Sequence, residues 1–203
     1  MEDKKLPLNI ELLAMEDGFA YDVTILDENA TVGQYIDLLD AFLAEKIAPC
    51  IGCDLCCKQR IPLTLPDLYA YAGRKREDIE AFLKEKTLIR KSGVVYDIQL
   101  AQRDDGSCIY LDRQNRRCLD HDHRSLVCHT YICLPQTKRA RDLREELINK
   151  GEDALFGAVF ALNLLEDSQG PKNYRVNPLW QDKSFAEIKL KEVLSPSVYE
   201  ALL

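Results

Sequence analysis

Four cysteines within eight residues are the part of this sequence with the clearest chemistry. They form the run Cys50-x2-Cys53-x2-Cys56-Cys57. Thiolates bind soft and borderline metals such as zinc, copper(I) and the iron of iron–sulfur clusters. Two intervening residues let a turn bring two sulfurs to one centre, and Gly52 eases such a turn. The spacing therefore predicts a metal site in this loop.

The repeat of two intervening residues resembles the start of the bacterial ferredoxin pattern, which wraps three corners of a 4Fe–4S cluster. The fourth cysteine departs from that pattern because Cys57 follows Cys56 directly. Adjacent side chains diverge, so the two thiols do not easily serve one compact tetrahedral ion. Either Cys57 turns toward a second centre, or one of the pair is a ligand while the other packs.

A second group of cysteines follows in the middle of the chain, at Cys108, Cys118, Cys128 and Cys133. A hairpin would hold the first pair together, and a helical turn could hold the last pair. Each group of four could bind one zinc ion or one cluster, or the two groups could interleave around a shared centre. We expect all eight cysteines to be metal and cofactor ligands, with an iron–sulfur cluster (4Fe–4S) as cofactor and zinc as the alternative.

Composition favours metal ligation over the other uses of cysteine. The 203 residues are 46% hydrophobic and 30% charged, so the chain can bury a core without disulfides. Neither a signal peptide nor an apolar run long enough to span a bilayer is evident, so we expect a reducing cytoplasm where disulfides rarely persist. Burial of free thiols would explain only one or two of eight.

Charge limits the kinds of partner. A net charge of −7 argues against nucleic-acid binding and against a membrane partner. A protein or redox partner is compatible with it. Basic residues that cluster locally either face solvent or compensate an anionic thiolate group; they are Arg113, Arg116, Arg117, Arg124, Lys138, Arg139, Arg141 and Arg144.

The three histidines, His121, His123 and His129, all fall within the second cysteine group. With eight thiols present we expect them to be exposed or hydrogen-bonded, with His129 the best candidate for a ligand because it neighbours Cys128. No phosphate-binding loop, metalloprotease motif, nucleophile elbow or dinucleotide fingerprint is found. Catalytic residues therefore cannot be assigned, and whether the protein is an enzyme stays open.

The sequence patterns around these residues predict an α+β fold, with helices around a small antiparallel sheet or hairpin. We expect a single domain over residues 1–203, with a cysteine core at 48–135, an N-terminal extension at 1–47 and a helical C-terminal extension at 136–203. Alternation and capping signals predict hairpins at 6–28 and 108–118, a strand at 94–100, and helices at 31–46, 64–73, 76–86, 137–150, 152–166 and 184–194, with Gly151 breaking the long helical stretch.

The middle of the chain resembles the YkgJ family, the CxxCxxCC proteins described as zinc- or iron-chelating. The resemblance covers about residues 48–135. It rests on Cys50-x2-Cys53-x2-Cys56-Cys57, on Leu63-Thr-Leu-Pro-Asp67, and on the later residues Cys108-Ile-Tyr110-Leu-Asp112, Arg117-Cys118 and Arg124-Ser-Leu-Val-Cys128-His-Thr-Tyr131-Ile-Cys133. Ser125 and His129 depart from it, since the family usually has proline and arginine there.

The resemblance implies metal or iron–sulfur binding. A similar domain occurs in flagellin lysine methylases, where its cysteines look like iron–sulfur ligands, but that analogy covers the site and not methyl transfer. We therefore expect an iron–sulfur protein with a redox or accessory protein-modification role. The alternatives are a structural zinc module for protein interaction and, less favoured, a metal-dependent enzyme acting on a peptide or protein.

Overall fold

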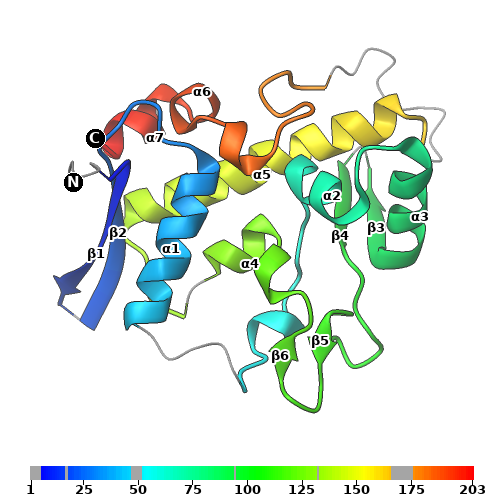
Figure 1. Cartoon of the computed structure of the whole chain (residues 1–203), viewed down its shortest axis with the longest axis horizontal. Coiled ribbons are helices and arrows are strands. Elements are labelled where there is room, and N and C mark those ends of the chain that lie inside the picture. The colour runs from blue at the N-terminus through cyan, green and yellow to red at the C-terminus, as the bar shows by residue number, and fades with distance from the viewer. Residues whose placement is uncertain (1–5, 17, 47–51, 94, 132, 166–175) are drawn as a thin grey trace, which may run out of the picture. The chain divides into compact units, whose positions relative to one another are not determined.

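The computed structural model describes residues 6–16, 18–46, 52–93, 95–131, 133–165 and 176–203. Within this part of the chain the fold is mixed α+β, as the sequence predicts (Figure 1). Its helices are α1 Val32–Lys46, α2 Leu65–Ala72, α3 Arg76–Lys86, α4 Leu126–Thr130, α5 Lys138–Ala161, α6 Leu190–Val193 and α7 Pro196–Ala201. Its strands pair as three antiparallel hairpins: β1 Leu8–Met15 with β2 Gly18–Ile25, β3 Thr87–Ser92 with β4 Val95–Leu100, and β5 Leu111–Asp112 with β6 Arg117–Cys118.

The chain divides into two compact units, each assembled from separated segments. The first contains Met1–Pro49, His129–Leu147 and Lys183–Leu203. The second contains Cys50–Cys128 and Ile148–Asp182. The single domain that we expect from the sequence stays a prediction.

The N-terminal hairpin and α1 form the apolar core of the first unit. Alternating apolar residues pair the strands in register from Leu8 opposite Ile25 to Met15 opposite Gly18. Thr31 begins α1 by accepting the backbone N–H of Gln34 at 3.2 Å. The buried residues of these elements are Leu8, Ala20, Tyr21, Val23, Ile25, Val32, Tyr35, Ile36, Leu39 and Phe42. Hydrophobic burial therefore stabilises the hairpin mainly through β2, together with Leu8 at the start of β1.

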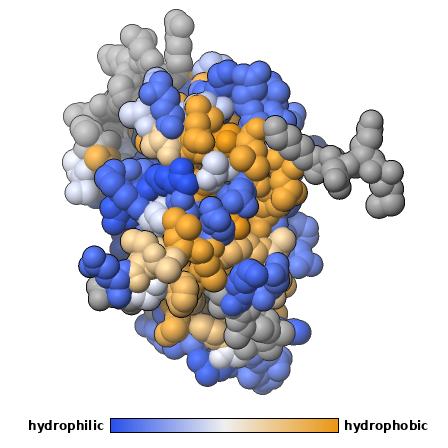
Figure 2. Space-filling model, turned by 90° about the vertical axis from the view of Figure 1, so that its left-hand side faces the viewer, coloured by the Kyte–Doolittle hydropathy of each residue, from blue (hydrophilic) through white to orange (hydrophobic). Residues whose placement is uncertain are grey.

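The turn end of the same hairpin leaves apolar side chains exposed. Leu12, Met15 and Phe19 are 38%, 53% and 61% exposed. Figure 2 views the side of the molecule where β1 and β2 lie and shows apolar side chains gathered there. Single exposed apolar residues are common, but a group of them on one hairpin is less so.

In the second unit, β4 pairs on both of its edges. Beyond its hairpin with β3, it meets the segment before α2: Leu63 N–H donates to the Ile98 carbonyl at 3.0 Å, and Leu100 N–H donates to the Ile61 carbonyl at 2.9 Å. The sequence predicts the strand at β4 but misses β3. The residues of β3, TLIRKS, alternate weakly and are largely exposed.

The C-terminal helices differ from the prediction. The predicted break at Gly151 is wrong, because α5 is one helix from Lys138 to Ala161. A Cβ on Gly151 would lie 2.6 Å from Thr64 Cγ2 and 3.2 Å from Trp180 Cζ3, so close packing requires the glycine. Glycine costs about 1 kcal/mol in a helix interior, but here its lack of a side chain lets the helix pack directly against Thr64 and Trp180.

Near the C-terminus, the predicted helix at 184–194 is two short pieces, the 3₁₀ turn η3 Phe185–Glu187 and α6. The prediction misses α7. Among the described residues, no helix is both long and apolar enough to cross a membrane.

Candidate metal centre

Seven of the eight cysteines lie within the described residues, and no disulfide joins any two of these seven; Cys50 lies outside them. The loop that carries Cys53 turns at Gly52, whose φ of +79° favours glycine. Cys56 and Cys57 begin the 3₁₀ turn η1 Cys56–Lys58, which closes when Gln59 N–H donates to the Cys56 carbonyl at 3.0 Å. This local geometry places two adjacent thiols at the start of a tight turn.

Backbone hydrogen bonds join this loop to the cysteine hairpin. Gly52 N–H donates to the Arg116 carbonyl at 3.2 Å, and Cys108 N–H donates to the Cys57 carbonyl at 2.7 Å. Within the hairpin, Leu111 pairs with Cys118. Segments 51 and 64 positions apart in the sequence thus meet through their main chains. The predicted hairpin over residues 108–118 is confirmed.

Helix α4 positions the next cysteine. Ser125 lies just before this helix, and its Oγ accepts the Cys128 N–H at 3.4 Å. At the position where the family usually has proline, the serine therefore supplies an N-cap. The helix ends at Thr130, so the helical turn that we expect to span Cys128 and Cys133 does not form. Cys133 is exposed and belongs to the first unit, whereas Cys128 belongs to the second.

Cys56 and Cys57 influence each other most strongly. Their mutual hydrogen bond lowers the pKa of the Cys56 thiol to about 6, assisted by the positive charge of Arg124 and opposed by burial. The same bond, together with burial and the charges of Cys56, Cys108 and Cys118, raises the pKa of Cys57. Within this pair Cys56 is therefore the thiol that ionises more readily, and Cys57 keeps its proton.

The later cysteines are harder to ionise. Burial raises the pKa of Cys108 and of Cys118, and it raises that of Cys128 to about 12. The charge of Cys56 adds to the rise at all three. Sulfurs from both cysteine groups are therefore close enough to repel one another as thiolates. A bound cation would remove that repulsion and displace the protons.

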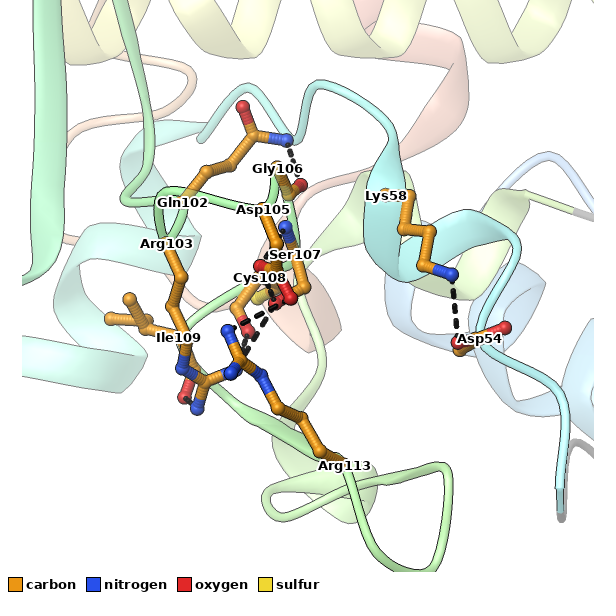
Figure 3. Close-up of polar contacts among 10 residues, drawn as sticks. All are labelled: Asp54, Lys58, Gln102, Arg103, Asp105, Gly106, Ser107, Cys108, Ile109 and Arg113. Carbon is orange, nitrogen blue, oxygen red and sulfur yellow. Dashed lines mark hydrogen bonds and ion pairs between the residues drawn. The ribbon is translucent and has the colours of Figure 1, made fainter.

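Basic residues act on this group in two ways. Arg124 lowers the pKa of Cys56 and of Cys118 through its charge, as the hypothesis of charge compensation predicts. Arg103 instead holds the backbone: its guanidinium donates to the carbonyls of Cys108 and Ile109, both at 2.6 Å (Figure 3). Nothing in the sequence pattern singled out Arg103.

A second polar contact ties the first loop to the hairpin turn. The Asp54 carboxylate forms ion pairs with Lys58 Nζ at 3.0 Å (Figure 3) and with Arg116 Nη2 at 2.9 Å. The hydrogen bond from Arg116 is the main cause of the lowered pKa of Asp54. Asp54 lies directly after Cys53, so it connects the cysteine loop to the residue before Arg117 and Cys118. Its position between two cysteines is the signal that sequence analysis could have used.

Aromatic rings border the same region. Tyr71 of α2 stacks on Tyr110 with ring centroids 5.5 Å apart. Burial raises the pKa of Tyr71, and the charge of Cys128 adds to that rise. Burial likewise raises the pKa of Tyr110, to which Cys108 and Cys118 contribute. Both phenols stay neutral and supply apolar surface beside the thiols.

The histidines have the surroundings that the sequence predicts. His121 and His123 have exposed side chains, and His123 contacts Asp120 at 2.8 Å. His129 is buried, and its Nδ1 lies 2.8 Å from Asp40 Oδ2. None of the three is among the causes of the cysteine pKa shifts.

The donor set fits a soft or borderline metal because thiols from two sequence-distant groups act on one another. Among the residues that the structure describes, no three His, Cys, Asp or Glu side chains already form a ligand set. Metal binding would therefore draw the described loops closer, or add Cys50. The ligand assignment stays a prediction.

Comparison with known proteins agrees with the cysteine pattern. Residues 49–149 match the family CxxCxxCC, described as "Putative zinc- or iron-chelating domain". Searches of curated proteins and of solved structures each returned no match.

Proposed function

Because residues 49–149 belong to the CxxCxxCC zinc- or iron-chelating family, we propose that the two cysteine groups supply one shared metal centre. Thiolates are its ligands, drawn from both the CxxCxxCC loop and the later group. The candidate ligands are Cys50, Cys53, Cys56, Cys57, Cys108, Cys118, Cys128 and Cys133, of which one 4Fe–4S cluster or one zinc ion would take four.

The observation that carries this proposal is the main-chain pairing of the CxxCxxCC loop with the cysteine hairpin, in which Gly52 N–H donates to the Arg116 carbonyl at 3.2 Å. The charge of Cys56 also contributes to the raised pKa of Cys108, Cys118 and Cys128, although the strongest single effect, between Cys56 and Cys57, lies within the first group. The hydrogen bond from Cys108 N–H to the Cys57 carbonyl supports the same arrangement. Interleaved ligands are therefore favoured over separate sites.

An iron–sulfur cluster is the proposed metal form. The support is the ferredoxin-like spacing of Cys50, Cys53 and Cys56. A four-cysteine zinc site usually uses two pairs of closely spaced cysteines, and only the first group has them. Zinc is the second candidate because the family description names it. When bound, either metal would tie the loops together, and a cluster would add one-electron chemistry.

The proposed role is redox or accessory to the modification of another protein, in a reducing compartment such as the cytoplasm. A protein or redox partner fits this role. The acidic net charge of −7 does not favour nucleic acid. We assign no catalytic residue.

Anaerobic purification with metal analysis and an absorption spectrum tests the proposal. If the centre is an iron–sulfur cluster, the analysis should find iron and acid-labile sulfide, and the spectrum should show absorbance at about 400 nm. If the protein contains zinc without iron, the zinc site is the correct alternative and the cluster is not. Neither metal in stoichiometric amount, in protein purified and reconstituted anaerobically, would contradict the shared metal centre itself.

A further inference from the structure

We propose that Asp67 is a positioning residue of the metal centre, because its carboxylate fixes the start of the helix that carries Cys128. One oxygen, Oδ2, accepts the backbone N–H and the hydroxyl of Thr64, both at 2.8 Å. The other, Oδ1, accepts the backbone N–H of Leu126 at 2.9 Å. The link to metal binding rests on the proposed function.

Asp67 is far more than a local helix cap. With Thr64 it forms the capping box of α2, which satisfies donors at the start of that helix. The bond to Leu126 reaches a residue 59 positions away, at the first position of α4. One side chain thus aligns the beginnings of two helices.

The residue type matters because both oxygens are acceptors. Asp67 and Thr64 are 1% and 0% exposed, so water cannot replace a lost partner. An asparagine would present an N–H either to the Thr64 donors or to the Leu126 donor, whichever way its amide is turned. A buried donor facing a donor is destabilising, so only an ionised carboxylate satisfies all three donors.

The consequence for Cys128 follows from the shortness of α4. This helix has five residues, and so short a helix has no stability of its own in water. Its direction therefore depends on anchors at its start, namely Asp67 on Leu126 N–H and Ser125 on Cys128 N–H. Cys128 is the third residue of the helix, so a change in its start moves that sulfur.

A matched capping box provides a control. Ser184 and Glu187 form the same box on η3, where Glu187 Oε2 accepts the Ser184 N–H at 2.9 Å and its hydroxyl at 2.7 Å. Neither residue adjoins a cysteine in the sequence. Glu187→Gln therefore disturbs a box with the same hydrogen-bond pattern, at an exposed position and at a distance in sequence from the cysteines.

The test compares Asp67→Asn with Glu187→Gln in the full chain. We measure zinc(II) affinity by chelator competition, and the alkylation rate of each cysteine in the metal-free protein by mass spectrometry. Asp67→Asn should weaken zinc binding about 10-fold to 100-fold, the range known for residues that orient metal ligands. It should also raise the alkylation rate of Cys128 relative to Cys53, while Glu187→Gln should change neither.

Unchanged Cys128 reactivity in a folded Asp67→Asn protein would overturn the inference, as would equal effects of the two variants. If the unsubstituted protein bound no zinc or iron, the proposed function would fail, but the alkylation rates would still decide the positioning role. Should Asp67→Asn not fold, Leu126→Pro and Leu126→Ala give the same test. Both truncate the side chain, and only the proline removes the N–H that Asp67 binds, so equal Cys128 reactivity in this pair would overturn the inference.

Discussion

The N-terminal hairpin and the cysteine hairpin are closed by different forces. The strands β1 and β2 pair over eight positions each and bury Leu8, Tyr21 and Val23 almost completely. The strands β5 and β6 pair over two positions each. The loops around them are held by main-chain hydrogen bonds, such as Cys108 N–H to the Cys57 carbonyl, and by side chains bonded to the backbone, such as Arg103 on the Cys108 carbonyl.

This difference separates what folds by apolar burial from what is prepared for a ligand. Burial of apolar side chains, most of them on β2, stabilises the first hairpin. The cysteine hairpin gains little from burial, and its thiols repel one another when ionised. Its stability should therefore depend on the bound metal, because metal binding to such loops contributes directly to folding.

Removing the metal should give the largest contrast between the two hairpins. After chelation, backbone amides of residues 108–118 should exchange at least about tenfold faster, since a structural metal contributes several kcal/mol. Amides of residues 8–25 should keep their protection. Hydrogen exchange followed by mass spectrometry measures both in one sample. Equal loosening of the two hairpins would show that their stability does not differ in this way.

Breaking a charged contact should have a smaller effect, confined to the N-terminal hairpin. Asp22 is buried and accepts hydrogen bonds from the Arg139 side chain and from Thr137 Oγ1. Asp22→Asn should lower the free energy of unfolding by about 2 kcal/mol at pH 7, because the Arg139 charge loses its partner. Chemical denaturation measures this loss, and zinc or iron binding should be unaffected.

The same contact predicts a pH dependence. Burial alone would raise the pKa of Asp22, but the hydrogen bonds from Arg139 and Thr137 outweigh it and lower the pKa below the ordinary 3.8. The unfolded chain therefore binds this proton more readily, and the contribution is fully present above pH 3.8 and is lost as the pH falls through the lower folded value. The stability difference between Asp22→Asn and the unsubstituted protein should shrink below about pH 4. A constant difference down to pH 2 would contradict this assignment.

The smallest effect concerns the polar contacts of the cysteine hairpin. Arg103→Met keeps an unbranched apolar stem but removes two hydrogen bonds to the backbone carbonyls of Cys108 and Ile109. It should cost about 1–2 kcal/mol in the metal-free protein and less when metal is bound. Arg113→Met is the control, because Arg113 is exposed and its ion pair with Asp105 lies at the surface. Equal unfolding midpoints for the two variants would show that Arg103 does not hold this loop.

Local patterns allowed much of the fold to be predicted. The alternation in residues 8–25 and the caps Thr31 and Thr64 depend on neighbours within a few positions, and the elements that they predict are present. Gly151 was misjudged because local propensity disfavours glycine in a helix, whereas the packing of Thr64 requires it. The exposed residues of β3 carry too weak a pattern to predict a strand.

The sequence by itself determined the thiol chemistry, the CxxCxxCC family and the helices and hairpins whose signals are local. Only the tertiary structure decided that Cys56 acts on Cys108, Cys118 and Cys128, and that Asp67 reaches Leu126. Such contacts join residues 52 to 72 positions apart for the thiols and 59 for the carboxylate. Their geometry depends on how the chain packs. The groups that the fold brings near a buried donor decide its hydrogen bond, and the groups near a thiol decide its pKa.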